Sequence, residues 1–95
     1  RLQGWRILDQ RVRQRAGEID LIARRGRTTA FIEVKTRTTV AALDLAIDDY
    51  RLRRVAAAVQ AVSHCYARRG DDIRIDIILI APRAWPRHLV NVWHG

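Results

Sequence analysis

Two short β-rich segments joined by a single turn constrain the fold of this 95-residue chain more than any other feature. Residues 18–23 (Glu-Ile-Asp-Leu-Ile-Ala) and 29–36 (Thr-Ala-Phe-Ile-Glu-Val-Lys-Thr) are rich in the residues that strands favour. Between them, Arg-Gly-Arg at 25–27 contains the only turn-forming residue available. The pattern predicts an antiparallel β-hairpin.

The position of the turn decides which residues face one another. With Gly26 and Arg27 at its centre, glycine comes first, as a type II′ turn requires, and Arg25 pairs with Thr28. A turn centred on Arg25 and Gly26 would change the partners but keep the faces. A three-residue loop would move the facing acids to opposite sides of the sheet.

The first of these turns places Asp20 opposite Glu33, and Glu18 opposite Lys35. Opposed Cβ atoms lie about 4.5–5.5 Å apart, and like charges there are destabilising. Three compensations are available: Lys35 could neutralise the acids, one acid could take up a proton, or a hard cation such as Mg²⁺ could bind both. A solvated polar face with a Glu18–Lys35 ion pair is the alternative. We favour a site, because acids are depleted in strands and this pair lies between apolar neighbours.

Three further segments predict strands, at residues 5–13, 73–80 and 89–93. The second is almost continuously apolar and predicts a central strand covered on both faces. Gly17 marks a turn before the hairpin, and residues 82–86, bounded by prolines, predict a loop.

A long helix is predicted from Asp48, after a helical turn or ordered loop at 39–47. We expect Arg68 and Arg69 in its last turn and Gly70 as its C-cap. Spacings of three and four residues define one buried stripe, made of Leu52, Val55, Ala56, Val59, Val62, Ser63 and Tyr66.

The resulting order, β-β-β-α-β-β, predicts one α/β domain over residues 1–95, with a central mixed sheet and the long helix packed on one face. The single Cys65 cannot form an internal disulfide, so a cytoplasmic location is the default expectation. No apolar run approaches the ~20 residues that span a bilayer, so we expect no membrane partner.

Net charge is +8, which favours a polyanion partner such as nucleic acid, although a merely basic surface is about equally common. Of the 18 basic residues only Lys35 is a lysine. Because an ammonium group is a compact point charge and a guanidinium group a planar fork, a site that needs the former would explain the exception.

The strings Gly-Glu-Ile-Asp-Leu-Ile-Ala (17–23) and Phe-Ile-Glu-Val-Lys-Thr-Arg (31–37) closely resemble the YraN-like family of small bacterial endonuclease-like proteins. That family is similar to the PD-(D/E)XK, or restriction-endonuclease-like, nucleases, near the Holliday-junction resolvases. The resemblance runs from about Trp5 through Asp76.

The resemblance implies a Mg²⁺- or Mn²⁺-dependent endonuclease that hydrolyses DNA phosphodiester bonds, on branched or single-stranded structures. Asp20, Glu33 and Lys35 match its catalytic residues. Asp20, Glu33 and the carbonyl of Val34 match its metal ligands, and Glu18 is a further candidate that could instead orient Lys35. Junction-cleaving relatives act as dimers, so a homodimer is expected by analogy.

Two departures from the family pattern stand out. Family members usually begin with a helix whose glutamate faces the metal, so we expect this domain to be N-terminally incomplete. Residues 48–52 stand where the family often has Thr-Pro-Arg-Lys-Gln, so its helical Gln or Lys is absent unless Arg51 substitutes.

Other residues remain open between binding and structural roles. Arg37, Arg51, Arg53 and Arg54 are candidates for phosphate contact, with a solvated surface as the alternative. Trp5, Trp85 and Trp93 could stack on bases, although core or edge packing is more common. We expect His88 and His94 at the surface. We expect Asp76 as an ion-pair partner in the core, with an acid that supports the metal ligands as the alternative.

Three functions therefore compete. The first is a metal-dependent nuclease, the second a non-catalytic nucleic-acid-binding domain that keeps the nuclease fold, and the third a basic protein-interaction domain.

Overall fold

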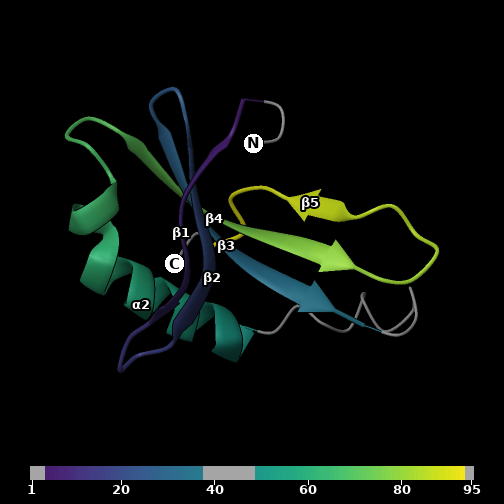
Figure 1. Cartoon of the computed structure of the whole chain (residues 1–95). Coiled ribbons are helices and arrows are strands. Elements are labelled where there is room, and N and C mark those ends of the chain that lie inside the picture. The colour runs from purple at the N-terminus through teal and green to yellow at the C-terminus, as the bar shows by residue number, and fades with distance from the viewer. Residues whose placement is uncertain (1–3, 38–48, 94–95) are drawn as a thin grey trace.

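The computed structural model describes residues 4–37 and 49–93, in which five strands form one sheet and a helix crosses it (Figure 1). The predicted order β-β-β-α-β-β is confirmed for this part of the chain. The elements are β1 (Arg6–Arg13), β2 (Glu18–Arg25), β3 (Thr28–Thr36), α2 (Asp49–Tyr66), β4 (Asp72–Ile80) and β5 (Arg87–Leu89).

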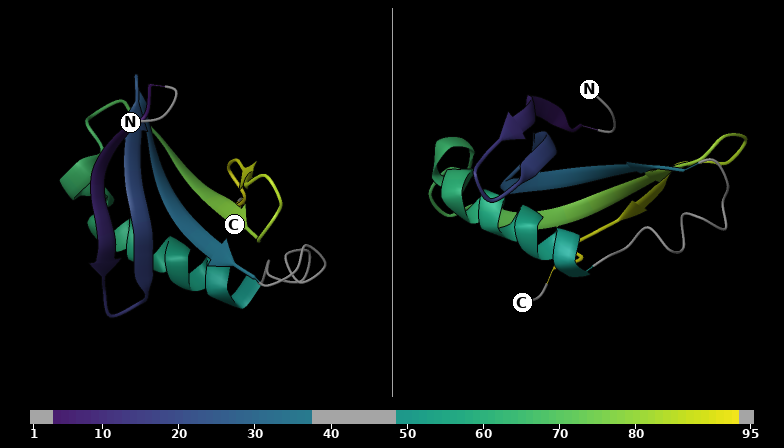
Figure 2. Two further views of the ribbon diagram at one scale, coloured as in Figure 1. Left: turned by 45° about the vertical axis from the view of Figure 1, so that its right-hand side comes forward. Right: turned by 90° about the horizontal axis from the view of Figure 1, so that it is seen from below.

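The sheet is mixed, and its strands lie side by side in chain order. Only β3 and β4 are parallel, and α2 makes the connection between them. The other neighbours are antiparallel. Figure 2 shows α2 lying against one face of the sheet, so the chemistry of that face depends on which side chains each strand turns toward the helix.

The β2–β3 hairpin has the predicted register. Arg25 pairs with Thr28 and Leu21 with Ile32. Gly26 has a φ of 61°, the left-handed value that the first central residue of a type II′ turn adopts. The local turn chemistry therefore sets the faces of both strands.

Gly17 lies in the turn between β1 and β2, as expected, and fits closely against the helix. Reciprocal backbone hydrogen bonds join Gln14 and Gly17, at 2.8 and 3.2 Å. A Cβ atom at Gly17 would lie 3.0 Å from the carbonyl oxygen of Arg54 in α2. Only glycine lets this turn approach the helix backbone so closely.

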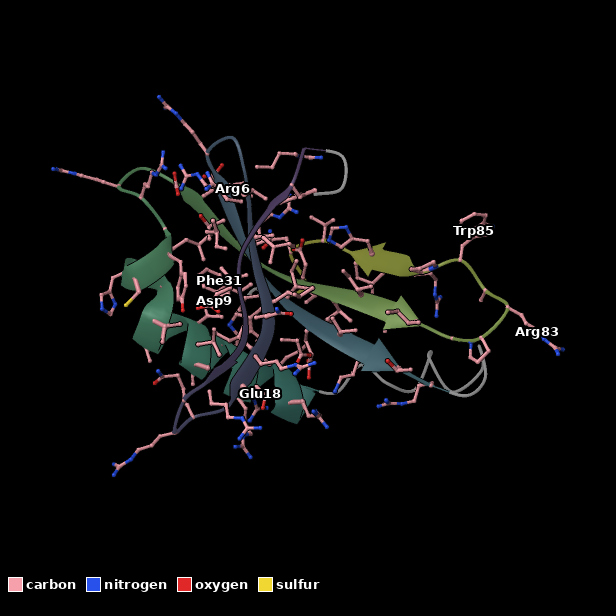
Figure 3. The ribbon with its side chains drawn as sticks, viewed as in Figure 1. Arg6, Asp9, Glu18, Phe31, Arg83 and Trp85 are labelled. Atoms are coloured by element: carbon pink, nitrogen blue, oxygen red, sulfur yellow. The ribbon has the colours of Figure 1, made fainter. Side chains whose placement is uncertain are left out.

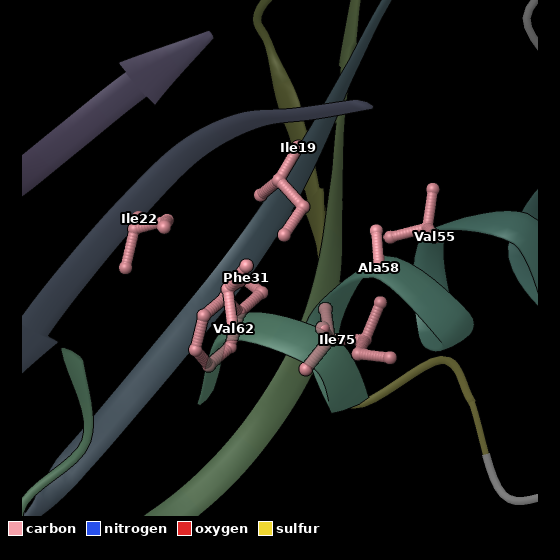
Figure 4. Packing of buried hydrophobic residues seen from close by; sticks show 8 residues of the cluster. Ile19, Ile22, Phe31, Val55, Ala58, Val62 and Ile75 are labelled. Atoms are coloured by element: carbon pink, nitrogen blue, oxygen red, sulfur yellow. The ribbon is translucent and has the colours of Figure 1, made fainter. Parts of the chain in front are cut away.

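One stripe of α2 packs on the sheet, and Figure 4 shows part of this core. The predicted stripe is largely confirmed, with Ala56, Ser63 and Tyr66 only partly buried. The core cluster consists of Ile19, Ile22, Phe31, Val55, Ala58, Val59, Val62 and Ile75.

The end of α2 was predicted too late. The helix stops at Tyr66, and the Ala67 N–H donates to the Ser63 carbonyl at 2.8 Å. Gly70 (φ 86°) is therefore not the C-cap; it lies in the turn that leads into β4, and Arg68 and Arg69 follow the helix. The carboxylate of Asp71 accepts the N–H of Arg68 at 2.8 Å, a hydrogen bond that takes the place of one within the helix.

The middle of β4 is buried, as predicted for a central strand, but its ends are open: Ile73 is 48% and Ile80 37% exposed. The final strand was misplaced, because β5 ends at Leu89 instead of running over 89–93. Asn91 has a φ of 53° and donates its N–H to Asp76 at 2.9 Å, which turns the chain away from a straight edge strand.

Predictions for 39–47, Asp48 and His94 fall outside the described residues. No helix in the described ranges has the length and apolar character to cross a membrane.

Candidate active site

A cavity of about 600 Å³ opens between the β1–β2 turn, the helix-facing side of β2 and β3, and the first turns of α2. It collects three of the acids predicted from sequence and two arginines. Its lining is Gly17, Glu18, Asp20, Glu33, Arg51, Arg54 and Val55. Asp20 and Glu33 thus come from neighbouring strands and face one space.

Asp20 lies where the two strands of the hairpin part. The last ladder pair is Leu21 with Ile32, and beyond it the Val34 N–H donates to Oδ2 of Asp20 at 2.7 Å. The carboxylate thus replaces a backbone acceptor and fixes its own orientation. Within residues 4–37 and 49–93, hydrogen bonding thus engages one of the two carboxylate oxygens.

Glu33 is buried, with 5% of its surface exposed, and two cations approach the same oxygen. Lys35 Nζ lies 2.9 Å from Glu33 Oε1, and Arg51 Nη2 lies 3.5 Å from it. Because Lys35 is itself only 4% exposed, the ammonium and the carboxylate compensate each other in a poorly solvated setting. Lys35 thus neutralises Glu33 but is not among the residues that line the cavity.

Glu18 does not orient Lys35, so that expectation was wrong. Its side chain is 44% exposed and lies 3.5 Å from Nε of Arg13. At this point β2 has left β3 and pairs with β1, where Glu18 is the partner of Arg13. Glu18 still lines the cavity, at its solvent side.

The predicted arginines separate by helical position. Arg51 and Arg54, three residues apart, line the cavity, and Arg54 Nε also donates to the Ala16 carbonyl at 3.0 Å. Arg53 instead lines a second groove, on the side of α2 toward Trp93. Arg37 is half-buried at the end of β3, where its guanidinium bonds the Thr36 carbonyl at 2.8 Å. Helical periodicity alone could have distinguished Arg53 from the other two.

The donor set suits a small hard cation. Mg²⁺ commonly binds through one or two carboxylates and keeps several waters, and here two carboxylates with one oxygen each engaged face the same cavity. Within residues 4–37 and 49–93, no three His, Cys, Asp or Glu side chains cluster as a cage made only of protein ligands would need. A cation held by these two carboxylates would take its remaining ligands from water.

Two further acids are tied into closed networks. Asp76, fully buried, accepts hydrogen bonds from Arg74, from His88 Nε2 at 2.7 Å and from the Asn91 N–H. It is the core ion-pair partner that its sequence position predicted. The contact with His88 was not foreseen, because it depends on where β5 pairs.

Asp71 was missed from the sequence. It forms a bidentate ion pair with Arg24 and accepts a hydrogen bond from Thr29 at 3.1 Å. Burial raises the pKa of this carboxyl, but its hydrogen bonds from the Arg68 N–H, Arg24 and Thr29 outweigh burial, and the pKa lies below its ordinary value. No local signal marks this pairing, because Arg24 and Asp71 are 47 residues apart.

Comparison with known proteins places the chain in a family. Residues 1–80 match the model of "Uncharacterised protein family UPF0102". The chain is 66% identical to the UPF0102 protein of Sphingopyxis alaskensis over 93 residues, 98% of this chain and 80% of that protein. It is 59% identical to the UPF0102 protein of Rhizorhabdus wittichii over 95 residues, covering 100% and 80%. The chain therefore belongs to the UPF0102 family.

Proposed function

We propose that this protein is a metal-dependent phosphodiester hydrolase acting on DNA. The observation that carries the proposal is the convergence of Asp20 and Glu33 on one cavity rimmed by Arg51 and Arg54. Two acids, one paired with an ammonium group, share this cavity with two guanidinium groups. Such a set suits a phosphate ester, whose negative charge needs both a cation and hydrogen-bond donors.

Asp20 and Glu33 would hold Mg²⁺ or Mn²⁺ through their carboxylate oxygens. When bound, the ion polarises a phosphoryl oxygen and lowers the pKa of water. Asp20 is kept in place by the Val34 N–H, and Glu33 by Lys35. In the proposed site Val34 adds its carbonyl and Glu18 a peripheral carboxylate.

Lys35 has two tasks in this proposal. Its ammonium group holds Glu33 in one orientation, 2.9 Å away, and supplies a fixed positive charge behind the phosphate. Arg51 and Arg54 lie at the rim, where their guanidinium groups contact the nucleic-acid backbone. Arg37, at the end of β3, adds a further contact to the nucleic-acid backbone. Arg53 contributes only to the overall positive charge of the protein.

The proposal includes a restriction-endonuclease-like fold and, by the same resemblance, a homodimer. What supports the fold is the mixed sheet with one parallel pair bridged by α2 and the acids on its helix-facing side. Light scattering at several concentrations would measure the oligomeric state.

A non-catalytic nucleic-acid-binding domain is the second candidate. It is favoured by the 3.5 Å approach of Arg51 to Glu33, which adds a second cation to the carboxylate that a metal would need. The two candidates differ in metal binding.

The test is calorimetric titration of Mn²⁺ into the wild-type protein and into Asp20→Asn, with cleavage assays on linear, nicked and four-way DNA. Asparagine keeps an oxygen acceptor for the Val34 N–H but loses the charge. Asp72→Asn, at an exposed acid that begins β4, is the matched control. We expect Asp20→Asn to lose both metal binding and cleavage while the control keeps both. Absence of metal-dependent cleavage by the wild-type protein on all three substrates would refute the nuclease and leave the binding domain.

A further inference from the structure

The loop between β4 and β5, residues 81–86, presents an exposed aromatic side chain. Trp85 is 91% exposed, against 37–52% for the other exposed large apolar side chains in the described part of the chain. Figure 3 shows it projecting from the loop at the far right of the view. Trp5 and Trp93 are half-buried, so of the three tryptophans Trp85 has its ring free for a partner.

The backbone of the loop that carries Trp85 is restricted by one turn and two prolines. Ala81 is buried at its base, and the Ala84 N–H donates to the Ala81 carbonyl at 3.4 Å, which closes a turn with Pro82 at its second position. Pro86 restricts the backbone on the other side of the tryptophan. An aromatic side chain mounted on a stiff loop loses little conformational freedom when it binds.

Arg83 occupies the third position of that turn with a φ of 60°. A turn with proline second and a positive φ third has the type II pattern, in which glycine or asparagine is the usual third residue. Arginine is disfavoured in this conformation. Within residues 4–37 and 49–93, no hydrogen bond or ion pair of the Arg83 side chain offsets the cost of the strained backbone. Figure 3 shows the side chain pointing away from the protein. Backbone strain of this kind is common at ligand-binding sites, and among the described residues Arg83 shares it with Arg11 and Asn91.

The described residues that follow the middle of β4 along the chain include arginines and no acids. Residues 77–95 contain no Asp or Glu. Arg87 begins β5 directly after the loop, and the Arg37 N–H donates to the Ile80 carbonyl at 3.0 Å, where β4 ends. The tryptophan is thus edged by arginines at the same end of the sheet that follows Glu33 and Lys35 along β3.

We propose that this loop, residues 81–86, binds single-stranded nucleic acid, with Trp85 stacked on an unpaired base and Arg83 on a neighbouring phosphate. An exposed indole beside guanidinium groups fits a base and its phosphate, because every base has a π-face. Bases inside a duplex are covered on both faces by their neighbours, so a free base is required. The inference rests on the proposed function where it names the substrate class, DNA with a single-stranded segment.

The test measures binding of a labelled single-stranded oligonucleotide and of its duplex by fluorescence anisotropy, in chelator so that no cleavage occurs. We expect Trp85→Ala to lose about 5- to 100-fold in affinity for the single strand and little for the duplex, with Trp85→Phe retaining most of the affinity. The single strand should quench the tryptophan fluorescence of the wild-type protein, and Trp85→Phe should abolish this quenching.

Arg83→Gly tests the second contact. Glycine relieves the positive φ, so this variant should be at least as stable as the wild-type protein and still bind the single strand more weakly, with a salt dependence shallower by about 0.7 in log–log slope. The control is Arg69→Ala, which removes an exposed arginine beyond the opposite end of β4. An equal loss in both variants would reduce the effect to net charge and overturn the role of Arg83.

The outcomes separate this inference from the proposed nuclease. If Trp85→Ala binds both DNAs like the wild-type protein, or if Trp85 is needed for anionic vesicles and not for single strands, the inference fails even where cleavage is found. If Trp85 governs single-strand binding and no metal-dependent cleavage occurs, the nuclease fails and the inference stands. Circular dichroism of each variant verifies that its fold is intact.

Discussion

The acids of the cavity and the acid inside β4 differ in how many of their carboxylate oxygens are engaged by neighbouring groups. Asp76 lies on the strand next to β3, fully buried, and its two oxygens are met by Arg74, His88 and the Asn91 N–H. Asp20 is held through Oδ2 and Glu33 through Oε1, and both face a cavity. A carboxylate with every oxygen engaged serves stability, whereas one with an oxygen facing open space can take a ligand.

This contrast predicts that stability and function divide between the two regions. Loss of a closed carboxylate should unfold the protein more readily, and loss of an open one should cost binding or cleavage instead.

The largest effect on stability is expected for Asp76→Ala. The change leaves the guanidinium of Arg74 and the Asn91 N–H without their partner inside the sheet, which should cost about 3–5 kcal/mol. Urea denaturation followed by circular dichroism measures the loss. Asp20→Asn, the comparison variant, should lose less than about 1.5 kcal/mol, the usual worth of one hydrogen bond. Equal losses in the two variants would mean that Asp20 is structural as well.

A double-mutant cycle across Glu33 and Lys35 comes next. Lys35→Met keeps the volume of the side chain but removes the nearer cation from a buried carboxylate; among the described residues, the exposed Arg51 is then the one cation left within 4 Å. We expect a loss of about 2–4 kcal/mol, smaller in the Glu33→Gln background, where no charge is left unpaired. Denaturation of the four proteins gives the coupling energy. A coupling near zero would show that the pair adds no stability, and that Lys35 is required for another reason.

Sequence reasoning succeeded where the physics is local. Gly26 sets the hairpin turn, the turn sets the register, and alternation along β2 and β3 then puts Asp20 and Glu33 on one face. The stripe of α2 followed from helical spacing in the same way. These steps involve neighbours within about 15 residues of one another.

What could not be predicted depends on pairing between distant segments. Glu18 meets Arg13 because β2 pairs with β1 from Glu18 to Arg24, whereas its pairing with β3 covers only Leu21 to Arg25; the hairpin pattern does not contain this difference. The partner of Asp71 is Arg24, and His88 reaches Asp76 only because β5 pairs with β4 two residues earlier than expected. Such contacts follow from packing of the whole sheet.

Gly17→Ala tests the close contact between the β1–β2 turn and α2, and its expected effect on stability is smaller. The new Cβ would lie 3.0 Å from the Arg54 carbonyl oxygen, so the turn and the helix must separate by a few tenths of an ångström. We expect about 1 kcal/mol of destabilisation, at the low end for overpacking. Thermal unfolding measures it, and the control is Arg15→Ala, at an exposed position of the same turn. If Gly17→Ala is as stable as the wild-type protein, the turn is free to move and the cavity is less rigid than its geometry indicates.

The smallest effect concerns Asp9, which is exposed yet closed: it accepts the Gln10 N–H at 2.8 Å and the Tyr66 hydroxyl at 2.7 Å. The Tyr66 hydrogen bond lowers the pKa of Asp9, and the same bond raises the pKa of Tyr66 from 10.0 to about 12. The stabilisation from Tyr66 is fully present below pH 10 and is lost as pH rises toward 12, while that from Asp9 is present above its ordinary pKa of 3.8 and is lost as pH falls below it. Tyrosinate absorbance in a Tyr50→Phe background isolates Tyr66, and Asp9→Asn should return its pKa toward 10.0. If Tyr66 already titrates near 10.0 with Asp9 present, the bond is not formed in solution. Full engagement of a carboxylate would then be a property of the core alone, and the division between closed and open acids would apply only where water is excluded.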